Sequence, residues 1–289
     1  MHNRSIRQNK FNLPSMRNLW KTLGGYDALV EYNECAIRQL LVKWEQNKEI
    51  IPDWTEFIKA QSAEVGVRLR NINVEQYRQD IYLWYLVHPY GCMDSFVKEF
   101  KEDLKAFGFD ISNAINNDDK ARDKARDKNA IEKLIVGLKE LRITVSVEPY
   151  KMDLDSYYRR CRNLFVHKLD NGEKKKIRTL YNNLDKEKIH NFYPNQKLAL
   201  SAPCEFTFDD YILCTANIKN IADTLTTDIY GSIDWNKYVF EDCKFKAKLK
   251  NYDEKPERIT GALHSYIRSR YGITLSEEEI DILKKKLTQ

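Results

Sequence analysis

Glycine and proline are scarce in this chain, and their scarcity constrains the fold more than any other feature of the sequence. Only 10 Gly and 7 Pro occur in 289 residues. The long stretches between them are rich in Lys, Glu, Leu, Ala, Arg and Ile, and apolar residues recur there at the three- and four-residue spacing of helices. Because few breakers interrupt many helix-forming residues, we expect an all-α fold.

Charge and cysteine content narrow the class of protein. The net charge of +5 permits binding to RNA or DNA, without the concentrated positive charge of a nucleic-acid coat protein. The six cysteines form no CxxC pair, so we predict buried thiols rather than a zinc site or a disulfide framework. The leading residues lack the apolar region of a signal peptide, and no apolar run approaches the length of a membrane span. We expect a cytoplasmic protein that uses no cofactor or metal.

The N-terminal part, residues 1–73, has a helical pattern after a polar, basic lead-in. The pattern is interrupted at Gly24–Gly25, so we expect a short helix, a turn and a longer amphipathic helix over about residues 27–47. Pro52–Asp53 then supplies a stop and an N-cap for the next helix. We treat this part as an N-terminal helical segment.

The central part, residues 74–230, is expected to hold a helical bundle. Its first helix should break near His88–Pro89, because the residue before a proline is pushed out of the helical region. Asp94 or Ser95 would cap the helix that follows, and Gly108 would end it. The many aromatic residues of this stretch are interpreted as core packing.

Between about residues 110 and 128 the chain changes character. The repeated letters KARD, with almost no large apolar residue, predict either a solvated linker or the exposed start of the next helix. That helix is expected over Ala130–Leu141. The β-branched run at Ile143–Pro149 is interpreted as an extended connector, because no partner strand is apparent.

Later segments complete the expected helices. A turn signal at residues 170–172 is followed by a basic insertion at about residues 171–203, which could be a hairpin of helices suited to a phosphodiester chain. Another helix opens at Phe208. The C-terminal helical segment, residues 231–289, has an aromatic patch and two final helices, the second of which begins with a capping box at Ser276.

The stretch Tyr157–Asp170 concentrates the side chains that bear chemistry. Its apolar residues recur at helical spacing, and Asp153 or Asp155 is expected to cap the helix. Arginine, amide and imidazole side chains stand together there, at Arg162, Asn163 and His167. Such a set can hold a phosphate and move a proton beside it.

The roles of these three residues follow from their chemistry. Arg162 carries a permanent charge on a planar fork that suits non-bridging phosphate oxygens. His167 can take a proton from a ribose 2′-OH or give one to the leaving 5′ oxygen, and Asn163 can hold the imidazole or the substrate. Because RNA supplies its own nucleophile, the expected products are a 2′,3′-cyclic phosphate and a 5′-OH.

Helix geometry sets a condition on this hypothesis. Asn163 and His167 are four residues apart and share one face. Arg162 and His167 are five apart, about 140° round an ideal helix. They converge only if the helix ends or distorts near His167, if the long Arg162 side chain sweeps round, or if a second copy of the chain contributes.

Spacing alone is not specific. Arg160 also shortly precedes His167, and a second pair, Arg258 and His264, stands near the C-terminus. We favour the first pair, because an asparagine directly follows Arg162 and no polar residue directly follows Arg258.

At Arg162-Asn163-Leu164-Phe165-Val166-His167 the chain resembles the HEPN superfamily, the helical domains of many prokaryotic toxins, abortive-infection proteins and CRISPR-associated ribonucleases. The family signature is Arg, a polar residue that is often Asn or His, and His a few residues later, near a helix end. The resemblance covers about residues 74–230 and is specific only in the motif. It implies a HEPN-like helical bundle with additional N-terminal and C-terminal helices.

The resemblance also implies a function and partners. It implies an endoribonuclease with Arg162, Asn163 and His167 as catalytic residues, assembled by a homodimer, which acts on RNA in toxin–antitoxin or anti-phage defence. An antitoxin or defence-system partner protein would restrain it. Some HEPN toxins carry a tyrosine two residues after the histidine, where this chain has Leu169, so a nucleotide-modified tyrosine is not supported there. The family's architecture suggests that a helix with acidic residues packs near the motif, the candidates being Glu99, Glu102 and Asp103.

Two other functions remain open from the sequence. The first is a non-catalytic helical module that binds protein or RNA, in which Arg162 and His167 only pack and cap. The second is a basic DNA-binding protein that uses the last two helices.

Overall fold

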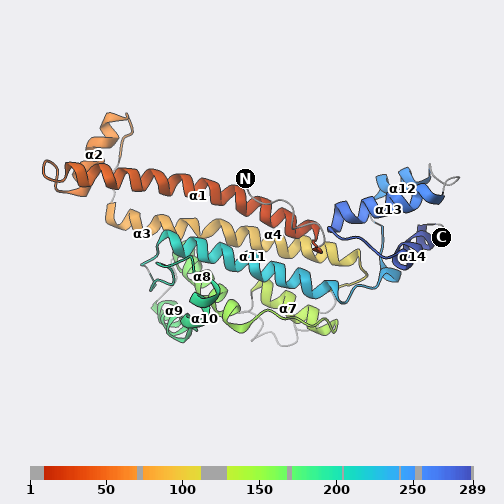
Figure 1. The fold of residues 1–289 in the computed structure, drawn as a ribbon. Helices are drawn as coiled ribbons and strands as arrows, with labels where there is room; N and C mark the ends of the chain where they lie inside the picture. The colour runs from red at the N-terminus through yellow and green to blue at the C-terminus, as the bar shows by residue number, and fades with distance from the viewer. Residues whose placement is uncertain are drawn as a thin grey trace. The chain divides into compact units, whose positions relative to one another are not determined.

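The computed structural model describes residues 10–69, 74–111, 129–167, 171–203, 205–240, 242–250 and 256–287. All regular secondary structure in these residues is helical, which confirms the all-α class (Figure 1). The helices are α1 (Pro14–Asn47), α2 (Trp54–Glu64), α3 (Val74–Tyr85), α4 (Val87–Lys105), α7 (Ala130–Glu140), α8 (Pro149–His167), α9 (Asn171–Asn183), α10 (Lys186–Phe192), α11 (Phe208–Tyr230), the 3-10 helix η2 (Trp235–Lys237), α12 (Cys243–Lys250), α13 (Pro256–Tyr271) and α14 (Glu277–Leu287). Within the described ranges, none of them has the length and apolar character needed to cross a membrane.

Contacts divide the chain into two compact units that are not consecutive in sequence. Unit 1 combines Met1–Trp20, Met93–Val147 and Asn220–Gln289, and unit 2 combines Lys21–Cys92 and Glu148–Lys219. The helices α1, α4 and α11 therefore each contribute residues to both units. This partition differs from the consecutive parts 1–73, 74–230 and 231–289, which stay a prediction.

Unit 1 has an aromatic core centred on Phe107, just after α4. The Phe107 ring lies 5.2 Å from that of Tyr271, 5.4 Å from that of Tyr238 and 5.8 Å from that of Trp235, measured between ring centroids. All four side chains are buried. Tilted and edge-on rings at these distances stabilise a core beyond their buried area, so this cluster ties α4, η2 and α13 together.

Helix ends in unit 1 follow local signals in the sequence. Gly108 has φ +78°, and the Phe109 N–H donates to the Leu104 carbonyl at 3.1 Å, which confirms the predicted stop. At the start of α14, the backbone N–H of Ser276 donates to the Glu279 carboxylate at 2.7 Å, while the Glu279 N–H donates to Ser276 Oγ at 3.3 Å. The predicted capping box is confirmed.

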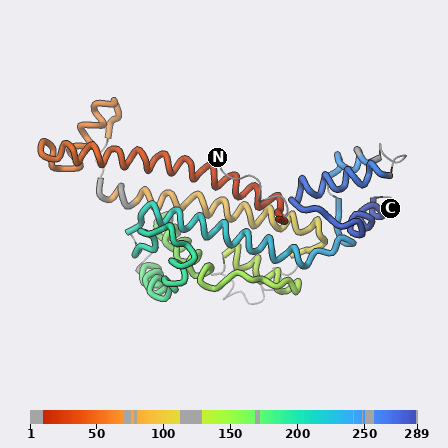
Figure 2. Tube along the Cα trace, viewed as in Figure 1, coloured from red at the N-terminus to blue at the C-terminus, as the bar shows by residue number. Residues whose placement is uncertain are grey.

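Unit 2 is built on α1, α3 and α11, which Figures 1 and 2 show side by side. Val30 of α1, Tyr85 of α3 and Tyr211 of α11 form a buried cluster there. Tyr211 also donates its hydroxyl hydrogen to the Asp27 carboxylate at 2.6 Å. The helices α8, α9 and α10 belong to the same unit, and α8 contacts α3, α9 and α10.

Of two expected breaks, the first was wrong and the second lies two residues before its expected place. The helix α1 continues through Gly24–Gly25, because the buried side chains of Leu23 and Val30 on either side outweigh a helical glycine cost of about 1 kcal/mol each. The second break lies at Leu86, and α4 already begins at Val87. Pro89 falls in the first turn of α4, where its missing N–H forfeits no helical hydrogen bond.

The expected caps of two helices were wrong, because both helices begin earlier than expected. Asp94 and Ser95 lie inside α4 and do not begin it. Asp153 and Asp155 lie inside α8, which starts at Pro149. Proline at the first helical position has a preset φ and no unsatisfied donor, so it starts a helix as effectively as a capping side chain.

Other expectations about the middle of the chain are confirmed. The helix α7 covers Ala130–Glu140, within one residue of the expected range, and residues 143–148 form an extended connector. The basic insertion contains the short helices α9 and α10. The KARD repeat lies outside the described residues.

Candidate functional site

The helix α8 carries the candidate site, and its apolar face fixes it in unit 2. Leu154, Tyr158 and Cys161 recur at helical spacing and are buried, as their pattern predicted. Residues beyond Cys161 become progressively exposed toward the end of the helix. The first part of α8 is therefore an anchor, and its last turn reaches the surface.

Tyrosine hydroxyls hold the buried part of α8 to neighbouring elements. The Tyr157 hydroxyl donates to the Ser201 carbonyl at 2.7 Å, and the Tyr158 hydroxyl donates to Asp210 Oδ1 at 2.9 Å. Burial, and then the Asp210 charge, raise the pKa of Tyr158 well above its ordinary value. The hydroxyl therefore remains a donor at neutral pH, and it links α8 to α11.

Asp210 is a fully buried carboxylate at the centre of this connection. Besides the Tyr158 hydroxyl, it accepts the backbone N–H groups of Ser201 at 3.0 Å and Thr207 at 2.9 Å. The hydroxyls of the same two residues also donate to it, at 2.6 and 3.0 Å. A buried charge with this many donors is well compensated, so α8, α11 and the segment between them form a rigid support.

The described part of α8 extends as far as His167. Val166 and His167 are exposed, whereas the ring of Phe165 packs edge-on against Trp84 of α3 at 5.2 Å and 87°. The imidazole therefore lies at the surface, and the packing of Phe165 against Trp84 holds the last turn of α8 in place. Residues 168–170 lie outside the described residues, and Asn171 and Gly172 begin α9, so the turn expected at these two residues was wrong.

Arg162 and Asn163 are joined directly. Arg162 Nη1 donates to Asn163 Oδ1 at 2.9 Å. Both side chains are half-buried, and Arg162 Nε is buried without an acceptor among the described residues. Arg160 differs, because its guanidinium pairs with Glu173 of α9 at 3.0 Å. No described carboxylate pairs with Arg162, so its charge is not neutralised by the part of the chain that is described.

The geometry places these three residues only partly together. Asn163 lies one turn before His167 on the same face of α8, and the hydrogen bond to Asn163 draws the Arg162 guanidinium toward that face. The helix is continuous as far as His167, so the backbone directions of Arg162 and His167 stay about 140° apart. Within the described residues, no hydrogen bond joins His167 to either partner.

The second pair stands among side chains that have partners in unit 1. Arg258 is exposed on α13, and His264 lies six residues later, about 120° away round an ideal helix. His264 Nε2 lies 3.7 Å from the Glu277 carboxylate of α14. The ring of Tyr266 stacks on Phe245 at 4.0 Å, so both aromatic side chains serve packing in unit 1.

The acidic residues expected near the motif have partners in unit 1. Asp103 accepts the Ser15 backbone N–H at 2.8 Å, and Glu99 accepts both of its hydrogen bonds from the Asn18 amide, at 2.9 Å each. Glu102 pairs with Lys105 at 2.9 Å. These contacts give the three carboxylates roles in their own unit.

One polar cluster of unit 2 was not anticipated from the sequence. Glu34 of α1 is buried and accepts Arg38 Nε at 2.8 Å and the Tyr82 hydroxyl at 3.2 Å. It lines a half-open pocket of about 410 Å³ together with Phe208 and Asp209. The four-residue spacing of Glu34 and Arg38 was the available signal, but nothing in it distinguished the pair from the many exposed ones.

Within the described ranges, no three histidine, cysteine or carboxylate side chains gather closely enough to hold a metal ion. The polar side chains of Arg162, Asn163 and His167 at the end of α8 are a guanidinium, an amide and an imidazole. Comparison with protein-family models, with curated proteins and with solved structures finds no match to this chain.

Proposed function

We propose that this protein is an endoribonuclease of HEPN type, with Arg162, Asn163 and His167 as its catalytic residues. It would act without a metal ion, since the substrate ribose provides the nucleophile and Arg162 provides the positive charge. The 2′ oxygen attacks the phosphorus, the bond to the 5′ oxygen breaks, and the products carry a 2′,3′-cyclic phosphate and a 5′-OH. The resemblance to defence proteins suggests a role in toxin–antitoxin or anti-phage defence, with a partner protein that restrains it.

The observation that carries the proposal is the hydrogen bond from Arg162 Nη1 to Asn163 Oδ1 at 2.9 Å. Judged from sequence spacing alone, the Arg162 side chain leaves the helix about 140° away from His167. The bond to Asn163 draws it toward the face that also carries His167. An arginine that no described carboxylate neutralises and an exposed imidazole at the end of the same helix suit a phosphodiester with a proton to transfer.

The chemistry needs a base at the 2′-OH and an acid at the 5′ oxygen. One His167 can supply one of these at a time. Two copies of the chain related by a two-fold axis would form two sites, each with the Arg162 guanidinium of one chain and the His167 imidazole of the other, and water would complete the second proton transfer. Because Arg162 and His167 point in different directions around α8, a homodimer would also bring Arg162 of one chain to His167 of the other. The proposed site is therefore shared between two chains.

Cleavage of labelled RNA by purified wild type and His167→Ala, with EDTA present, tests this proposal. We expect cleavage by the wild type with cyclic-phosphate ends, and a loss of about 100-fold or more in His167→Ala, the scale of a lost general acid or base. His190→Ala is the matched control, because His190 is also an exposed helical histidine of unit 2. Thermal melting of each variant shows that it is folded.

Two outcomes would contradict the assignment. Equal cleavage by wild type and His167→Ala would exclude the site on α8. If His264→Ala lost cleavage while His167→Ala remained active, the catalytic residues would be Arg258 and His264.

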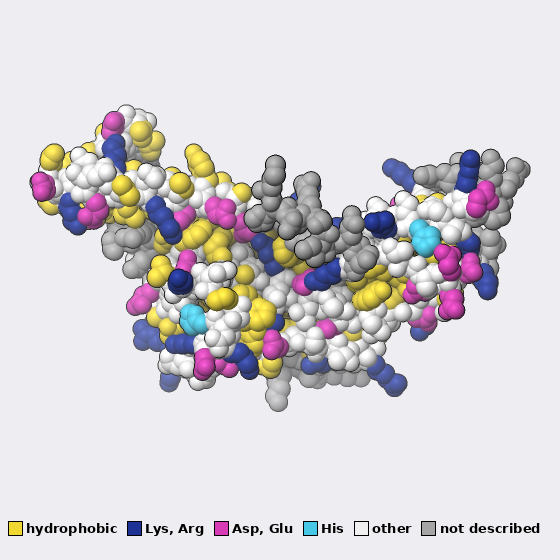
Figure 3. Space-filling view, viewed as in Figure 1, with side chains coloured by type: hydrophobic (Ala, Val, Ile, Leu, Met, Phe, Trp, Pro, Cys, Tyr) yellow, Lys and Arg dark blue, Asp and Glu magenta, His cyan; other side chains and the backbone are white. Residues whose placement is uncertain are grey.

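A non-catalytic module that binds a partner protein is the second candidate function. It is favoured by large apolar side chains that α1 exposes, since Leu29, Tyr32 and Val42 are 54%, 74% and 52% accessible. Figure 3 shows hydrophobic side chains on this helix. Such exposure on one helix is a feature of interaction surfaces. This function predicts that no variant, nor the wild type, cleaves RNA.

A further inference from the structure

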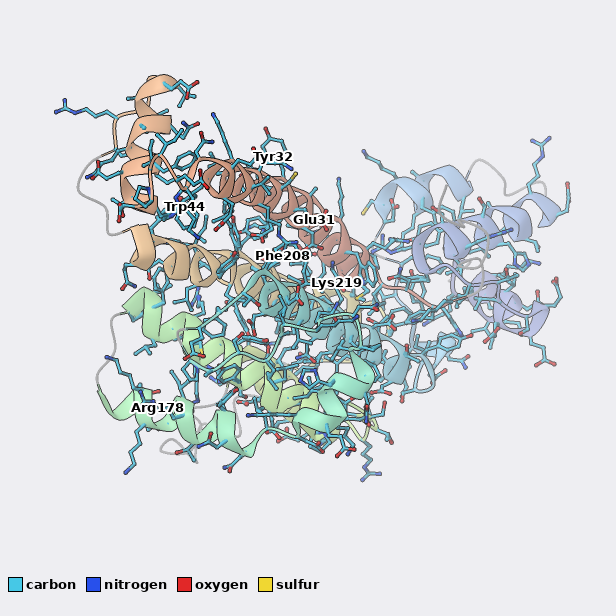
Figure 4. All side chains as sticks on the ribbon, turned by 60° about the vertical axis from the view of Figure 1, so that its left-hand side comes forward. Glu31, Tyr32, Trp44, Arg178, Phe208 and Lys219 are labelled. Carbon is cyan, nitrogen blue, oxygen red and sulfur yellow. The ribbon has the colours of Figure 1, made fainter. Side chains whose placement is uncertain are left out.

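The helix α9 presents a group of cations that the catalytic set does not use. Lys174, Lys175 and Arg178 are all exposed, and Figure 4 labels Arg178 on this helix. Lys174 and Arg178 are four residues apart and share a face, and Lys175 is adjacent. None of the three pairs with a carboxylate within the described part of the chain. We call these three residues the α9 basic surface.

Buried contacts of α9 fix this surface in place. Ile177 is fully buried, and the Tyr181 hydroxyl donates to the Leu200 carbonyl at 3.2 Å. An ion pair of 3.0 Å between Arg160 and Glu173 joins α9 to α8. The exposed cations therefore stand on a helix whose position relative to α8 is set by packing, and Figure 3 shows Lys and Arg side chains around it.

Beside these cations the surface is hollowed. A shallow depression of about 530 Å³ is lined by Arg160 of α8 and by Lys175, Lys176, Thr179 and Asn183 of α9. Glu173 pairs with Arg160 and with Lys176, the latter at 2.6 Å, so it offsets part of their charge. Lys175 adds positive charge and the Asn183 amide adds a neutral donor, whereas the Thr179 hydroxyl donates to the Lys175 carbonyl at 3.1 Å. Proteins use these same side chains to hold phosphate oxygens.

We propose that the α9 basic surface, with this depression, binds the phosphodiester backbone of RNA and delivers the strand to the end of α8. The inference rests on the proposed ribonuclease function, which it deepens by assigning the substrate-binding surface. Arg160 and His167 are seven residues apart, so they share one face of α8. A strand held at the depression would follow that face toward the imidazole. The surface would bind phosphates, so binding should depend on salt and not on base sequence.

The test measures RNA affinity in the His167→Ala background, where the substrate stays intact. Fluorescence anisotropy with a labelled single-stranded RNA is recorded over a range of salt concentrations. For Lys174→Ala/Lys175→Ala/Arg178→Ala we expect the Kd for RNA to rise at least tenfold. The slope of log K against log salt should fall by about 0.7 for each phosphate that the variant no longer neutralises. The reciprocal variant Lys174→Arg/Lys175→Arg/Arg178→Lys keeps the charge and should bind nearly as well as the parent.

A matched control separates local binding from net charge. Lys43→Ala/Lys48→Ala/Lys59→Ala removes the same number of exposed cations from α1, its following turn and α2, where each pairs with a carboxylate. It should leave the affinity and the salt slope nearly unchanged. The inference would be overturned if both triple variants weakened RNA binding equally. It would also be overturned if Lys174→Ala/Lys175→Ala/Arg178→Ala bound RNA as tightly as its parent.

The two proposals can fail separately. If wild type cleaves RNA and the α9 variant binds and cleaves like its parent, the surface is wrong and the ribonuclease stands. If wild type does not cleave but the α9 variant has a weaker RNA affinity and a smaller salt slope, the ribonuclease is wrong and the surface stands. Absence of any RNA binding by the parent would contradict the surface.

Discussion

Single glycines in this chain have opposite effects, depending on where they stand. Gly272 follows α13 with φ +75°, and a Cβ atom built there would lie 2.7 Å from the Lys10 carbonyl oxygen. Gly25 lies inside α1, and a Cβ atom there would meet nothing within 4 Å. The first position requires glycine for its backbone conformation and for its close approach. The second only tolerates it.

Alanine substitutions should separate these two glycines. Gly25→Ala is expected to stabilise the protein by about 0.5–1 kcal/mol, because alanine is the better helix former. Gly272→Ala is expected to destabilise it by about 2 kcal/mol or more, because a left-handed conformation costs a side-chain-bearing residue about 1–2 kcal/mol before the close approach to Lys10 is included. Denaturant unfolding monitored by circular dichroism measures both. Shifts of the same sign would contradict the interpretation.

For the candidate site, the sequence alone predicts which residues take part. Arg162, Asn163 and His167 are recognisable from type and spacing. The hydrogen bond between Arg162 and Asn163 is not, because it depends on which rotamer the long arginine side chain adopts. That choice is made by half-buried surroundings that come from other parts of unit 2.

At the scale of elements, the junction of α8 and α11 depends on Asp210. Its neighbour Asp209 stands in the same first turn of α11 but is less buried, and the hydrogen bond it accepts is from the Leu198 N–H at 2.8 Å. Asp210 serves Tyr158, Ser201 and Thr207 at once. Replacing it with asparagine leaves a similar shape but puts an NH2 group where an acceptor is needed.

We therefore expect Asp210→Asn to destabilise the protein by about 2–4 kcal/mol, since it leaves buried donors without an acceptor. Asp209→Asn should cost less than about 1 kcal/mol, because the remaining amide oxygen can still accept the Leu198 N–H. The measurement is the free energy of unfolding of each variant against wild type. Similar small decreases for both would show that Asp210 does not hold α8 to α11.

Elements with strong local signals were predictable, and those decided by packing were not. Gly108 and the box at Ser276 act within one turn of their own helix, so the ends they mark are visible in the sequence. The continuity of α1 through Gly24–Gly25 is decided by buried residues on either side, and these outweigh a local preference of about 1 kcal/mol per glycine. Pro89 shifted the expected break by two residues, because a proline is tolerated within the first turn of a helix.

At the scale of the whole molecule, the proposed function depends on pairing two chains. Within one chain, α8 continues as far as His167, so Arg162 and His167 project in different directions from its axis. A two-fold axis near the end of α8 would bring Arg162 of one chain to His167 of the other. No pattern in a single sequence specifies such an axis. Its existence can nevertheless be tested with two variants that are each inactive.

Mixing Arg162→Ala with His167→Ala should restore ribonuclease activity if the site is shared. After unfolding and refolding together in equal amounts, about half of the dimers are mixed, and each mixed dimer holds one complete site. The mixture should therefore show about a quarter of wild-type activity, although neither variant alone is active. The control mixes wild type with the double variant Arg162→Ala/His167→Ala, whose mixed dimers hold no complete shared site. An inactive mixture of the single variants, together with mixed control dimers that retain activity, would place both residues of each site in the same chain.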